Sequence, residues 1–410
     1  MQRSLKFVRY LPDHGWMPTV ISVKPESAAW PAVDPSMLVE IPEAVKVVRT
    51  PSRDPYAAYA RFKGRAKADT VGVGFADAQA PGAFEHLARF VRANLFLPDA
   101  RRGWVRFAKK AVRECLENQS YDAVVTSGPP HSTHFVGRWA QREFGIPWLA
   151  DFRDPWTEVS YYDQLPFLPW SRWLDRRWER GVLSEARSVV TVSEAVAALL
   201  REKSSRAVSV IPNGFDPEDL AGIEPRRGEG FRLVHTGTLA ESQNPEMLWP
   251  AVRTLRDQGL DLRIHCVGRV DASVRESIRQ AGLEEAFEFT PYVPHREALR
   301  YMAGADCLLM CVPRTRESAG ILTGKVFEYL ASGRPVLGIG PPDSDPARLI
   351  AQSGAGIMVA YTDPDAMRAF LHTKSAAESD HARPDPSYLE PYTRQSQAGT
   401  LAGELNRIAE

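Results

Sequence analysis

Short apolar segments alternate with longer segments whose apolar residues recur every three or four positions, and this pattern continues along most of the chain. Such alternation is typical of βα units, in which parallel strands are covered by helices on both faces. In the first half it predicts helices at residues 4–11, 104–119, 135–144, 170–186 and 194–203. It predicts strands at 17–23, 45–49, 121–126, 148–154, 188–192 and 208–211, and residues 57–82 are expected to be partly disordered or helical.

A second series of βα units begins after residues 222–230, a polar stretch rich in glycine and proline that we interpret as a linker. Its strands are expected at residues 231–235, 262–267, 287–290, 306–312, 335–339 and 356–360. The pattern therefore predicts an α/β protein with two doubly wound Rossmann-like domains that face one another across a cleft. We expect a first domain at residues 1–222, a second at 223–387, and a terminal helix at 388–410 that could pack back on the first.

A chain of 410 residues is long enough for two such domains. It has 51 basic and 51 acidic side chains, and this zero net charge gives no reason to expect a nucleic acid as the main partner. The four cysteines lack the spacing of metal ligands and are expected to be reduced thiols of a cytoplasmic protein. No apolar run approaches the ~20 residues that span a membrane, so we expect a protein that is soluble, or at most peripheral on the inner face of the membrane.

Residues 317–328 have the most informative chemical pattern, because they place two glutamates around a Gly/Thr turn that follows a predicted strand. Thr323 or Gly324 is suited to cap a helix at this point. The free N–H groups of such a helix start favour a phosphate, and Lys325 would add a full positive charge beside it. Glu328 is placed to accept hydrogen bonds from two vicinal hydroxyls, as in dinucleotide-binding folds. These residues predict a nucleoside diphosphate ligand, and the alternative is an ordinary βα turn with two solvated glutamates.

Further candidates follow other strands of the second domain. Gly237 permits a ligand to approach the backbone closely, and Thr238 offers a hydroxyl and an N–H to a phosphate. Arg269 could help to frame a base or a phosphate, and residues 290–294 resemble a loop that lines a base pocket. A plain glycine turn is the simpler interpretation of the first pair, and a proline-bounded edge turn is the simpler interpretation of the loop.

Two groups of polar residues follow strands of the first domain. Asp151, Arg153 and Asp154 place three charges at the end of an apolar strand, which is costly unless they are paired or functional. A structural pair between Arg153 and either aspartate is one interpretation, and binding of an acceptor or a sugar is the other. His131 and His134 lie in a turn that begins with two prolines and could face the same cleft, although a lone histidine is more often structural.

Three motifs that would indicate other functions are missing. No Asp-x-Asp pair directly ends a predicted strand, no Walker loop is present, and no Gly-x-Gly-x-x-Gly follows a strand. These absences argue against metal-dependent nucleotide-sugar chemistry, P-loop hydrolysis and a nicotinamide dehydrogenase, respectively.

Residues 90–110 mix apolar and basic side chains in a way that suits anionic lipid headgroups, which predicts a peripheral membrane contact. A solvated basic helix that packs on the core is the alternative interpretation. The side chains concerned are Leu95, Phe96, Leu97, Trp104 and Phe107 among Arg92, Arg101, Arg102, Arg106, Lys109 and Lys110.

Six blocks of residues are individually loose, but their order and spacing are specific. They are residues 3–16, Ser-Gly-Pro-Pro-His-Ser-Thr-His at 127–134, Trp-Leu-Ala-Asp-Phe-Arg-Asp-Pro-Trp at 148–156, Ile-Pro-Asn-Gly-Phe-Asp at 211–216, His-Thr-Gly-Thr-Leu at 235–239 and Gly-Lys-Val-Phe-Glu-Tyr-Leu-Ala-Ser-Gly-Arg-Pro-Val-Leu at 324–337. Together they resemble the bacterial group 1 (family 4-like) glycosyltransferases of the GT-B fold, and the resemblance covers nearly the whole chain.

This resemblance implies retaining, metal-independent transfer of a sugar from a nucleoside-diphosphate sugar to a glycan or lipid-linked acceptor of the cell envelope or an exopolysaccharide, with no further cofactor. It implies that Glu328 holds the ribose and that Glu317 meets the sugar. We expect catalytic roles for His131, Asp154 and Glu317, donor binding by Gly237, Thr238, Arg269, Leu322, Thr323, Lys325 and Glu328, and acceptor contacts from His134, Asp151 and Arg153.

The chain departs from the family pattern in two places. Family members usually begin with a strand and a Gly-rich loop before the first helix, whereas this chain starts at the helix, so its first domain is expected to lack the usual first strand. A basic residue that commonly follows the Gly-Thr turn is absent, and Glu-Ser-Gln-Asn-Pro stands at 241–245. A non-catalytic nucleotide-binding or partner subunit of the same fold and a nucleotide-sugar epimerase are therefore the alternatives to a transferase.

Overall fold

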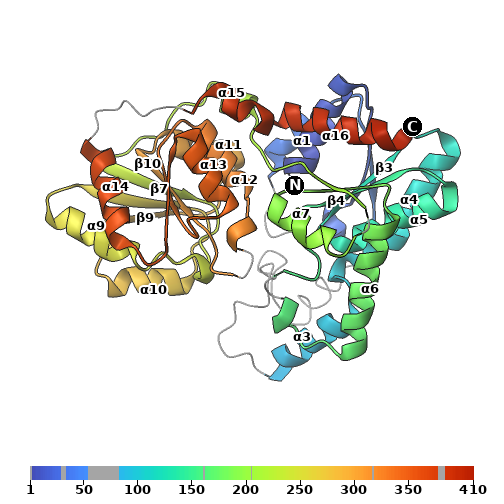
Figure 1. Ribbon diagram of the computed structural model, residues 1–410, viewed down its shortest axis with the longest axis horizontal. Coiled ribbons are helices and arrows are strands. Elements are labelled where there is room, and N and C mark those ends of the chain that lie inside the picture. Colours follow the sequence, from blue (N-terminus) through green and yellow to red (C-terminus); the bar gives the residue numbers. More distant parts are fainter. Residues whose placement is uncertain are drawn as a thin grey trace. The chain divides into compact units, whose positions relative to one another are not determined.

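The structure is a computed structural model, and it describes residues 2–28, 34–53, 83–159, 162–204, 206–315, 318–376 and 384–410 (Figure 1). The chain divides into two compact units. Unit 1 comprises Met1–Ile211 together with Ala398–Glu410, and unit 2 comprises Pro212–Gln397. The Ala/Gly-rich residues 57–82 lie outside the described residues.

Unit 1 contains two parallel sheets among its described residues. The larger has the order β3-β4-β5-β6, with bounds Val124–Gly128, Trp148–Phe152, Ser188–Thr191 and Val208–Val210. The smaller pairs β1 (Thr19–Val23) with β2 (Lys46–Thr50). The strand expected at 121–126 begins later, because its register with β4 starts where Val124 lies opposite Trp148.

The helices of unit 1 cover the larger sheet on both faces. Leu149 of β4 packs in one core cluster with residues of the first and last helices, whereas Trp148, Ala150 and Phe152 pack in the opposite cluster. Successive side chains of a strand point to opposite faces, so a strand that is buried on both faces must be apolar throughout. The helices are α1 (Gln2–Tyr10), α3 (Ala83–Leu95), α4 (Val105–Asn118), α5 (His134–Phe144), α6 (Pro169–Glu185) and α7 (Glu194–Arg201).

The last helix, α16 (Arg394–Ala409), contributes most of its length to unit 1. Leu401 and Leu405 join the core cluster that contains Leu149. The Glu404 carboxylate accepts hydrogen bonds from two serine hydroxyls of neighbouring strands, Ser188 at 2.8 Å and Ser209 at 2.7 Å. Apolar packing and these hydrogen bonds together fix the end of the chain against the larger sheet.

Unit 2 is built on one six-stranded parallel sheet with the order β12-β11-β10-β7-β8-β9. The sequence turns back after β9, so that β10 lies beside β7, and this makes the β7–β10 junction the topological switch point of the sheet. Ligands of open α/β sheets bind beyond the carboxyl ends of the strands at such a point. The strands are β7 (Phe231–Thr236), β8 (Leu262–Val267), β9 (Phe287–Thr290), β10 (Cys307–Cys311), β11 (Val336–Ile339) and β12 (Gly356–Val359).

Helices cover both faces of this sheet (Figure 1). Leu309 of β10 packs in the core cluster that includes Leu255 of α9, whereas its neighbour Leu308 packs with Phe327 of α12. The prediction of two α/β domains built on parallel sheets is therefore confirmed. The helices of unit 2 are α8 (Pro217–Leu220), α9 (Leu248–Asp257), α10 (Ala272–Gln280), α11 (His295–Ala303), α12 (Gly324–Ala331), α13 (Asp345–Ser353), α14 (Pro364–Ala376) and α15 (Pro386–Leu389).

The polar stretch at residues 222–230 lies inside unit 2, after the division of the chain at Ile211. Phe215, which precedes it, is buried in the same core cluster as Phe327. The Arg226 N–H donates to the Arg300 carbonyl at 2.9 Å. Packing and backbone hydrogen bonding thus hold this segment on unit 2, although its composition suggests a linker.

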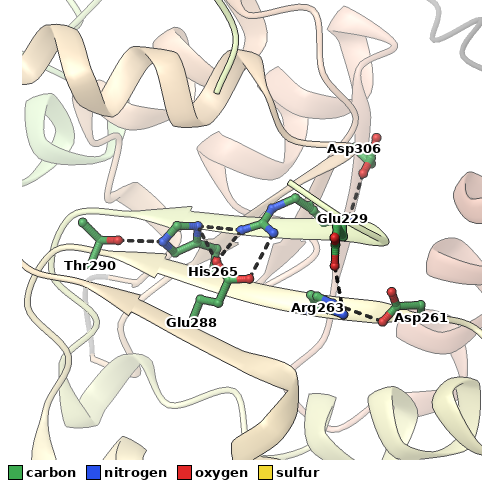
Figure 2. A network of polar contacts seen from close by, with 8 residues as sticks. Glu229, Asp261, Arg263, His265, Glu288, Thr290 and Asp306 are labelled. Carbon is green, nitrogen blue, oxygen red and sulfur yellow. Dashed lines mark hydrogen bonds and ion pairs between the residues drawn. The ribbon is translucent and has the colours of Figure 1, made fainter. Parts of the chain in front are cut away.

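A polar network crosses β7, β8 and β9 and ends at the loop 290–294 (Figure 2). Arg232 donates to Glu288 at 2.7 Å and lies 2.8 Å from His265 Nδ1. Since a guanidinium only donates, His265 Nδ1 accepts, and its Nε2–H donates to the Thr290 hydroxyl at 2.8 Å. Burial also lowers the pKa of His265, which agrees with a neutral ring. The network therefore fixes Thr290, the first residue of the loop.

The segment 90–110, expected to face lipid, has a different arrangement from the one its composition suggests. Leu97 is buried in the core, and the Trp104 indole N–H donates to the Thr50 hydroxyl at 2.8 Å. Leu95, by contrast, is exposed. Among the residues that the structure describes, no helix has the length and apolar character needed to cross a bilayer.

Candidate functional site

The Gly237 turn, directly after β7, lies at the switch point of the unit 2 sheet. Gly237 has φ +94°, and a Cβ at this position would lie 2.7 Å from Lys325 Cε and 2.8 Å from Lys325 Nζ. Only glycine therefore leaves room for the lysine side chain to cross the turn. Thr238 follows and is exposed.

A second glycine turn, after β8, supports the first. Gly268 has φ +132°, and a Cβ there would collide with the Gly237 carbonyl. The Gly237 N–H donates to the Val267 carbonyl at 2.7 Å, and the Leu239 N–H donates to the Arg269 carbonyl at 2.8 Å. The two turns are thus tied by their backbones. Sequence reasoning singled out Arg269 of this turn and not Gly268, although the position of Gly268 directly after a strand is the same signal that marked Gly237.

Lys325 lies in the first turn of α12, which begins at Gly324 after Thr323. Thr323 has extended backbone in the N-cap position, as expected, but its side chain makes no capping hydrogen bond. The ammonium group lies 3.5 Å from the Thr238 carbonyl. Burial lowers the pKa of Lys325 from its usual 10.5 to about 8, against the opposing effects of Cys311 and Glu328. Lys325 therefore remains mostly charged at neutral pH, in surroundings that disfavour the charge.

Tyr329 holds α12 against the end of β7. Its hydroxyl accepts a hydrogen bond from the Thr236 N–H at 2.9 Å and lies 3.2 Å from the Thr236 hydroxyl. The side chain is fully buried, and burial raises its pKa, so the hydroxyl stays neutral. Sequence reasoning missed this residue, because a tyrosine inside an apolar helix carries no sign of its partner.

His235 ties the end of β7 to β10. Its Nδ1 lies 3.0 Å from the Leu309 carbonyl and its Nε2 lies 3.3 Å from the Thr238 carbonyl. Burial, and then the charge of Lys325, lower the pKa of His235 to about 3. A neutral ring has one N–H, so it donates to only one of the two carbonyls.

A pocket of about 300 Å³, which includes open solvent, lies beside these residues. Gln243 forms part of its wall, but its side-chain amide donates to the Cys311 carbonyl at 2.9 Å and accepts from the Ala240 N–H at 3.1 Å. Lys325 is the one lysine or arginine among the described residues that line the pocket. Its lining consists of His235, Gln243, Met310, Cys311, Val312, Pro313, Ile321, Thr323, Lys325 and Tyr329.

Glu328 lies one turn further along α12 and has a partner that sequence reasoning missed. Its Oε1 is 2.9 Å from Nε2 of His295, and both side chains are largely buried. His295 is the first residue of α11, directly after the loop 290–294. The sequence signal that could have revealed this partner is a polar residue, His295, at the start of the helix that follows the loop.

The remaining donor-side candidates are placed as follows. Arg269 is exposed, and its backbone carbonyl serves the turn. The Leu322 carbonyl accepts from the Asn213 side-chain amide at 3.3 Å. Glu317 lies outside the described residues.

In unit 1, Asp151 is buried and pairs with Arg3 of α1, not with Arg153. The two guanidinium–carboxylate distances are 3.0 and 3.2 Å, and the Ser127 hydroxyl donates to the same carboxylate at 2.8 Å. Arg153 instead donates to the carbonyls of Gly128 and Pro129. The expected local pair is therefore wrong for Asp151, because a distant helix supplies its cation.

His131 and His134 are both buried beside Gly128. A Cβ on Gly128 would lie 2.6 Å from His134 Nε2 and 3.1 Å from His131 Nδ1, and neither nitrogen has a hydrogen-bond partner among the described residues. Burial lowers the pKa of His131 to about 3 and that of His134 well below 6.5. Both rings are therefore neutral at pH 7.

His134 is a core residue, since its Nδ1 lies 2.9 Å from the Thr126 hydroxyl, which also accepts from the Trp148 indole at 2.7 Å. His131 stacks on Trp156 with ring centroids 5.1 Å apart. Asp154, at the end of the β4 turn, is exposed. Of the unit 1 candidates, Asp154 is thus exposed, whereas His131, His134 and Asp151 are buried.

The geometry of unit 2 defines a class of protein. An open parallel sheet carries at its switch point a glycine turn, a half-buried lysine in the first turn of a helix, and a histidine-bound glutamate one turn later. Free N–H groups, the helix dipole and the lysine suit a phosphate, and the carboxylate suits hydroxyl groups. Such an arrangement is typical of nucleotide-binding α/β domains.

Family comparison makes the assignment more specific. Residues 2–214 match the glycosyl transferase 4-like domain, and residues 230–373 match the glycosyl transferases group 1 domain. The chain therefore belongs to the glycosyltransferases of this family.

Two curated relatives match part of the chain. A 2-deoxystreptamine glucosyltransferase of Streptomyces kanamyceticus is 28% identical over 178 residues, which are 40% of this chain and 45% of the relative. The amylovoran biosynthesis glycosyltransferase AmsK of Erwinia amylovora is 25% identical over 179 residues, which are 42% of this chain and 43% of the relative. The matches thus span less than half the length of these relatives.

Solved structures show the same fold at low sequence identity. A glycosyltransferase of Rickettsia africae has a TM-score of 0.60 at 13% identity, covering 100% of this chain and 94% of that one. Anabaena HepE in complex with UDP and glucose has a TM-score of 0.59 at 13% identity, covering 95% and 100%. A sucrose-phosphate synthase of Thermosynechococcus elongatus has a TM-score of 0.59 at 14% identity, covering 98% and 89%. The GT-B fold expected from the sequence is therefore confirmed.

Proposed function

We propose that this protein transfers a sugar from a nucleoside-diphosphate sugar to a glycan or lipid-linked acceptor of an envelope polysaccharide or exopolysaccharide, with retention of anomeric configuration and without a metal ion. The observation that carries the proposal is the position of Lys325. It lies in the first turn of α12, and its side chain crosses the Gly237 turn. Among the described residues, no carboxylate lies in salt-bridge range of this half-buried charge, and a cation at a helix start without a side-chain cap is suited to a bound anion.

The diphosphate lies beyond β7 and α12 in this proposal. Lys325 supplies a full positive charge, the start of α12 supplies about half a charge, and Thr238 supplies an exposed hydroxyl and N–H. Charge develops on the diphosphate as the sugar leaves, and groups already in place stabilise it without reorganisation. A metal ion is not required for this stabilisation, and no protein nucleophile is required at the sugar.

Glu328 accepts hydrogen bonds from the ribose hydroxyls. His295 Nε2 donates to Glu328 Oε1, which fixes the carboxylate and leaves Oε2 for the ligand. Since His295 also follows the loop 290–294, the ribose and the base are bound by neighbouring segments.

On the acceptor side, Asp154, which is exposed, and His131, which begins the turn beyond Gly128, Pro129 and Pro130, meet the acceptor hydroxyl. His131 is neutral, and its buried Nδ1 has no hydrogen-bond partner among the described residues. Arg153 orients the turn through the carbonyls of Gly128 and Pro129. His134 and Asp151 are buried and support this turn from inside the unit.

Similar proteins support the substrate classes. Anabaena HepE was solved with UDP and glucose, and AmsK acts in amylovoran biosynthesis. All four cysteines are free thiols, which fits a cytoplasmic enzyme. The zero net charge gives no reason to expect a nucleic acid as a partner.

The test uses the full chain and a panel of nucleoside-diphosphate sugars. Thermal stabilisation by donors or by nucleoside diphosphates, together with sugar transfer to lipid-linked or glycan acceptors, is the expected result, with NMR of the product to assign its anomeric configuration. Lys325→Met should abolish binding, whereas Lys110→Met, which changes an exposed lysine of unit 1, should not.

Three other results would contradict the proposal. Binding without transfer in any acceptor assay would indicate a non-catalytic nucleotide-binding subunit. Formation of an epimerised nucleotide sugar without acceptor would indicate an epimerase. Absence of nucleotide binding would overturn the donor site itself.

A further inference from the structure

Half of the exposed large apolar side chains gather in one part of unit 1. Twelve such side chains are exposed among the described residues, and six of them lie within residues 87–95 and 168–173. We refer to these six as the α3–α6 patch, and they are Leu87, Phe90, Leu95, Leu168, Trp170 and Trp173. Single exposed apolar residues need no explanation, but a cluster of this kind marks an interaction surface.

The two segments lie side by side although they are far apart in sequence. The Asn94 side chain of α3 is buried, donates to the Pro166 carbonyl at 2.9 Å and accepts from the Leu168 N–H at 2.8 Å. Figure 1 shows α3 next to the lower end of α6. One asparagine thus fixes the end of α3 to the residues just before α6, so the fold holds the two segments of the patch together.

The exposed face of α6 continues the patch with positive charge only. Trp170, Trp173 and Arg177 follow the i, i+3, i+7 spacing of one helix face, and Arg176 and Arg180 flank them, all exposed. The Arg177 guanidinium lies over the Trp173 ring, 5.5 Å from its centroid.

The acidic residues of α6 near this face point the other way. Asp175 and Glu179 are both buried, where Asp175 accepts from the Trp156 indole at 2.9 Å and Glu179 accepts from Lys203 at 2.8 Å. The exposed Asp163 nearby lies 3.5 Å from Arg172, so its charge is compensated. The surface that remains is aromatic and cationic.

We propose that the α3–α6 patch docks the protein on an anionic lipid bilayer. Tryptophan prefers the headgroup level of a bilayer, because its ring is apolar and its N–H is polar, and arginines beside it are attracted to anionic lipids. A protein partner would need acidic groups and a complementary shape, whereas an anionic bilayer supplies charge over any convex surface. The surface shares Phe90 and Leu95 with the segment 90–110 but has the two exposed tryptophans in place of the buried Leu97 and the half-buried Trp104.

Docking goes beyond the proposed reaction and is tested without it. If the proposed function holds, the patch brings unit 1 to the surface in which a lipid-linked acceptor is held. Failure of lipid binding would leave sugar transfer untouched, and failure of transfer would leave lipid binding untouched.

The experiment is flotation of the full chain with phosphatidylcholine vesicles and with vesicles that also contain phosphatidylglycerol, at low and at high salt. We expect flotation with phosphatidylglycerol only, and its loss at high salt. Each arginine near the surface contributes about 5-fold to binding, so Arg176→Gln, Arg177→Gln and Arg180→Gln together should weaken it by roughly 100-fold. Trp170→Ala with Trp173→Ala should reduce it on its own.

Matched control variants test whether lipid binding depends on this surface in particular and not on the total charge or the total exposed apolar area of the protein. Arg279→Gln, Arg348→Gln and Arg368→Gln remove the same charge from exposed positions of unit 2, and Met17→Ala with Val39→Ala removes exposed apolar side chains elsewhere in unit 1. Both controls should float like the unmodified protein. Equal flotation of the patch variants and the controls, or no flotation of the unmodified protein, would overturn the proposal, as would a dimer that the tryptophan variant alone disrupts. An unchanged melting temperature confirms that each variant is folded.

Discussion

Lys325 is the group whose titration should control phosphate binding, because burial lowers its pKa to about 8. At pH 7.5 about three quarters of the molecules carry the charge, and at pH 9.5 only ~3% do. A bound phosphate favours the charged form and raises the pKa again. The affinity for a nucleoside diphosphate should therefore fall about 25-fold between these pH values, which is ~1.9 kcal/mol.

Other groups in the pocket do not titrate in this range. Burial and the charge of Lys325 hold the pKa of His235 near 3, and burial raises the pKa of the Cys311 thiol to about 12 and that of Tyr329 further. The second ionisation of a phosphate ester, near pH 6, is complete. The pH dependence thus reports Lys325.

Isothermal titration calorimetry in buffers of different ionisation enthalpy measures the expected proton uptake, about half a proton at pH 8. Lys325→Arg keeps its charge to pH 9.5, so its affinity should vary little with pH. Lys325→Met should lose binding, and Lys110→Met should behave like the unmodified protein. A flat affinity from pH 7.5 to 9.5, or binding by Lys325→Met, would refute the reasoning.

The same residue should affect stability in the opposite direction. The folded-state pKa of Lys325 lies below its unfolded value, so the charge destabilises the folded protein at neutral pH, and this effect fades as pH rises from 8 toward 10.5. The shift corresponds to up to about 3 kcal/mol. Lys325→Met should therefore melt several degrees higher than the ligand-free protein.

Three further predictions concern single residues. Gly237→Ala should weaken nucleotide binding at least ~10-fold in calorimetry, because its Cβ displaces Lys325, whereas Gly259→Ala, with the same φ of +94° and open space around it, should bind normally. His295→Leu should raise the KM for the donor by about 10-fold with little change in kcat, and it should abolish discrimination between a nucleoside diphosphate and its 2′-deoxy analogue. His295→Gln should restore part of the donor affinity and part of the discrimination. Unchanged discrimination in His295→Leu would contradict the role of His295. Burial raises the pKa of Asp175 to about 7, so its ionisation should lower the stability of the folded protein increasingly as pH rises from 4 to 7. In urea unfolding, the free energy of unfolding of Asp175→Asn should exceed that of the unmodified protein by up to about 4 kcal/mol at pH 8 and by little at pH 4. Parallel pH curves for the two proteins would contradict this.

Local patterns in the sequence predict the elements of unit 2 closely, because glycine and proline bound the apolar runs. The strands β8 and β9 have the expected bounds, with Gly268 and Pro291 directly after them. Thr323 occupies the expected N-cap position of α12. A run of buried residues and the residue that ends it are both visible in the chain itself.

Long-range partners are not visible in this way. Asp151 pairs with Arg3, which is 148 positions away, while the nearer Arg153 serves a turn. His295 meets Glu328 only because α11 and α12 flank the same sheet. Periodicity gives the buried face of each element but not which elements meet, and the polar partners of a site depend on that.

The Gly237 turn departs from the rules of a stable fold in three respects at one place. Two glycines with positive φ lie against each other, a lysine is desolvated beside them, and the helix start lacks a side-chain cap. Each departure destabilises the ligand-free protein, and such conflicts tend to mark functional sites. One anion would satisfy the ammonium group and the helix N–H groups together, which no purely structural role of the turn explains. Opposite signs for the two effects of Lys325→Met, a gain in stability and a loss of binding, are what this explanation requires.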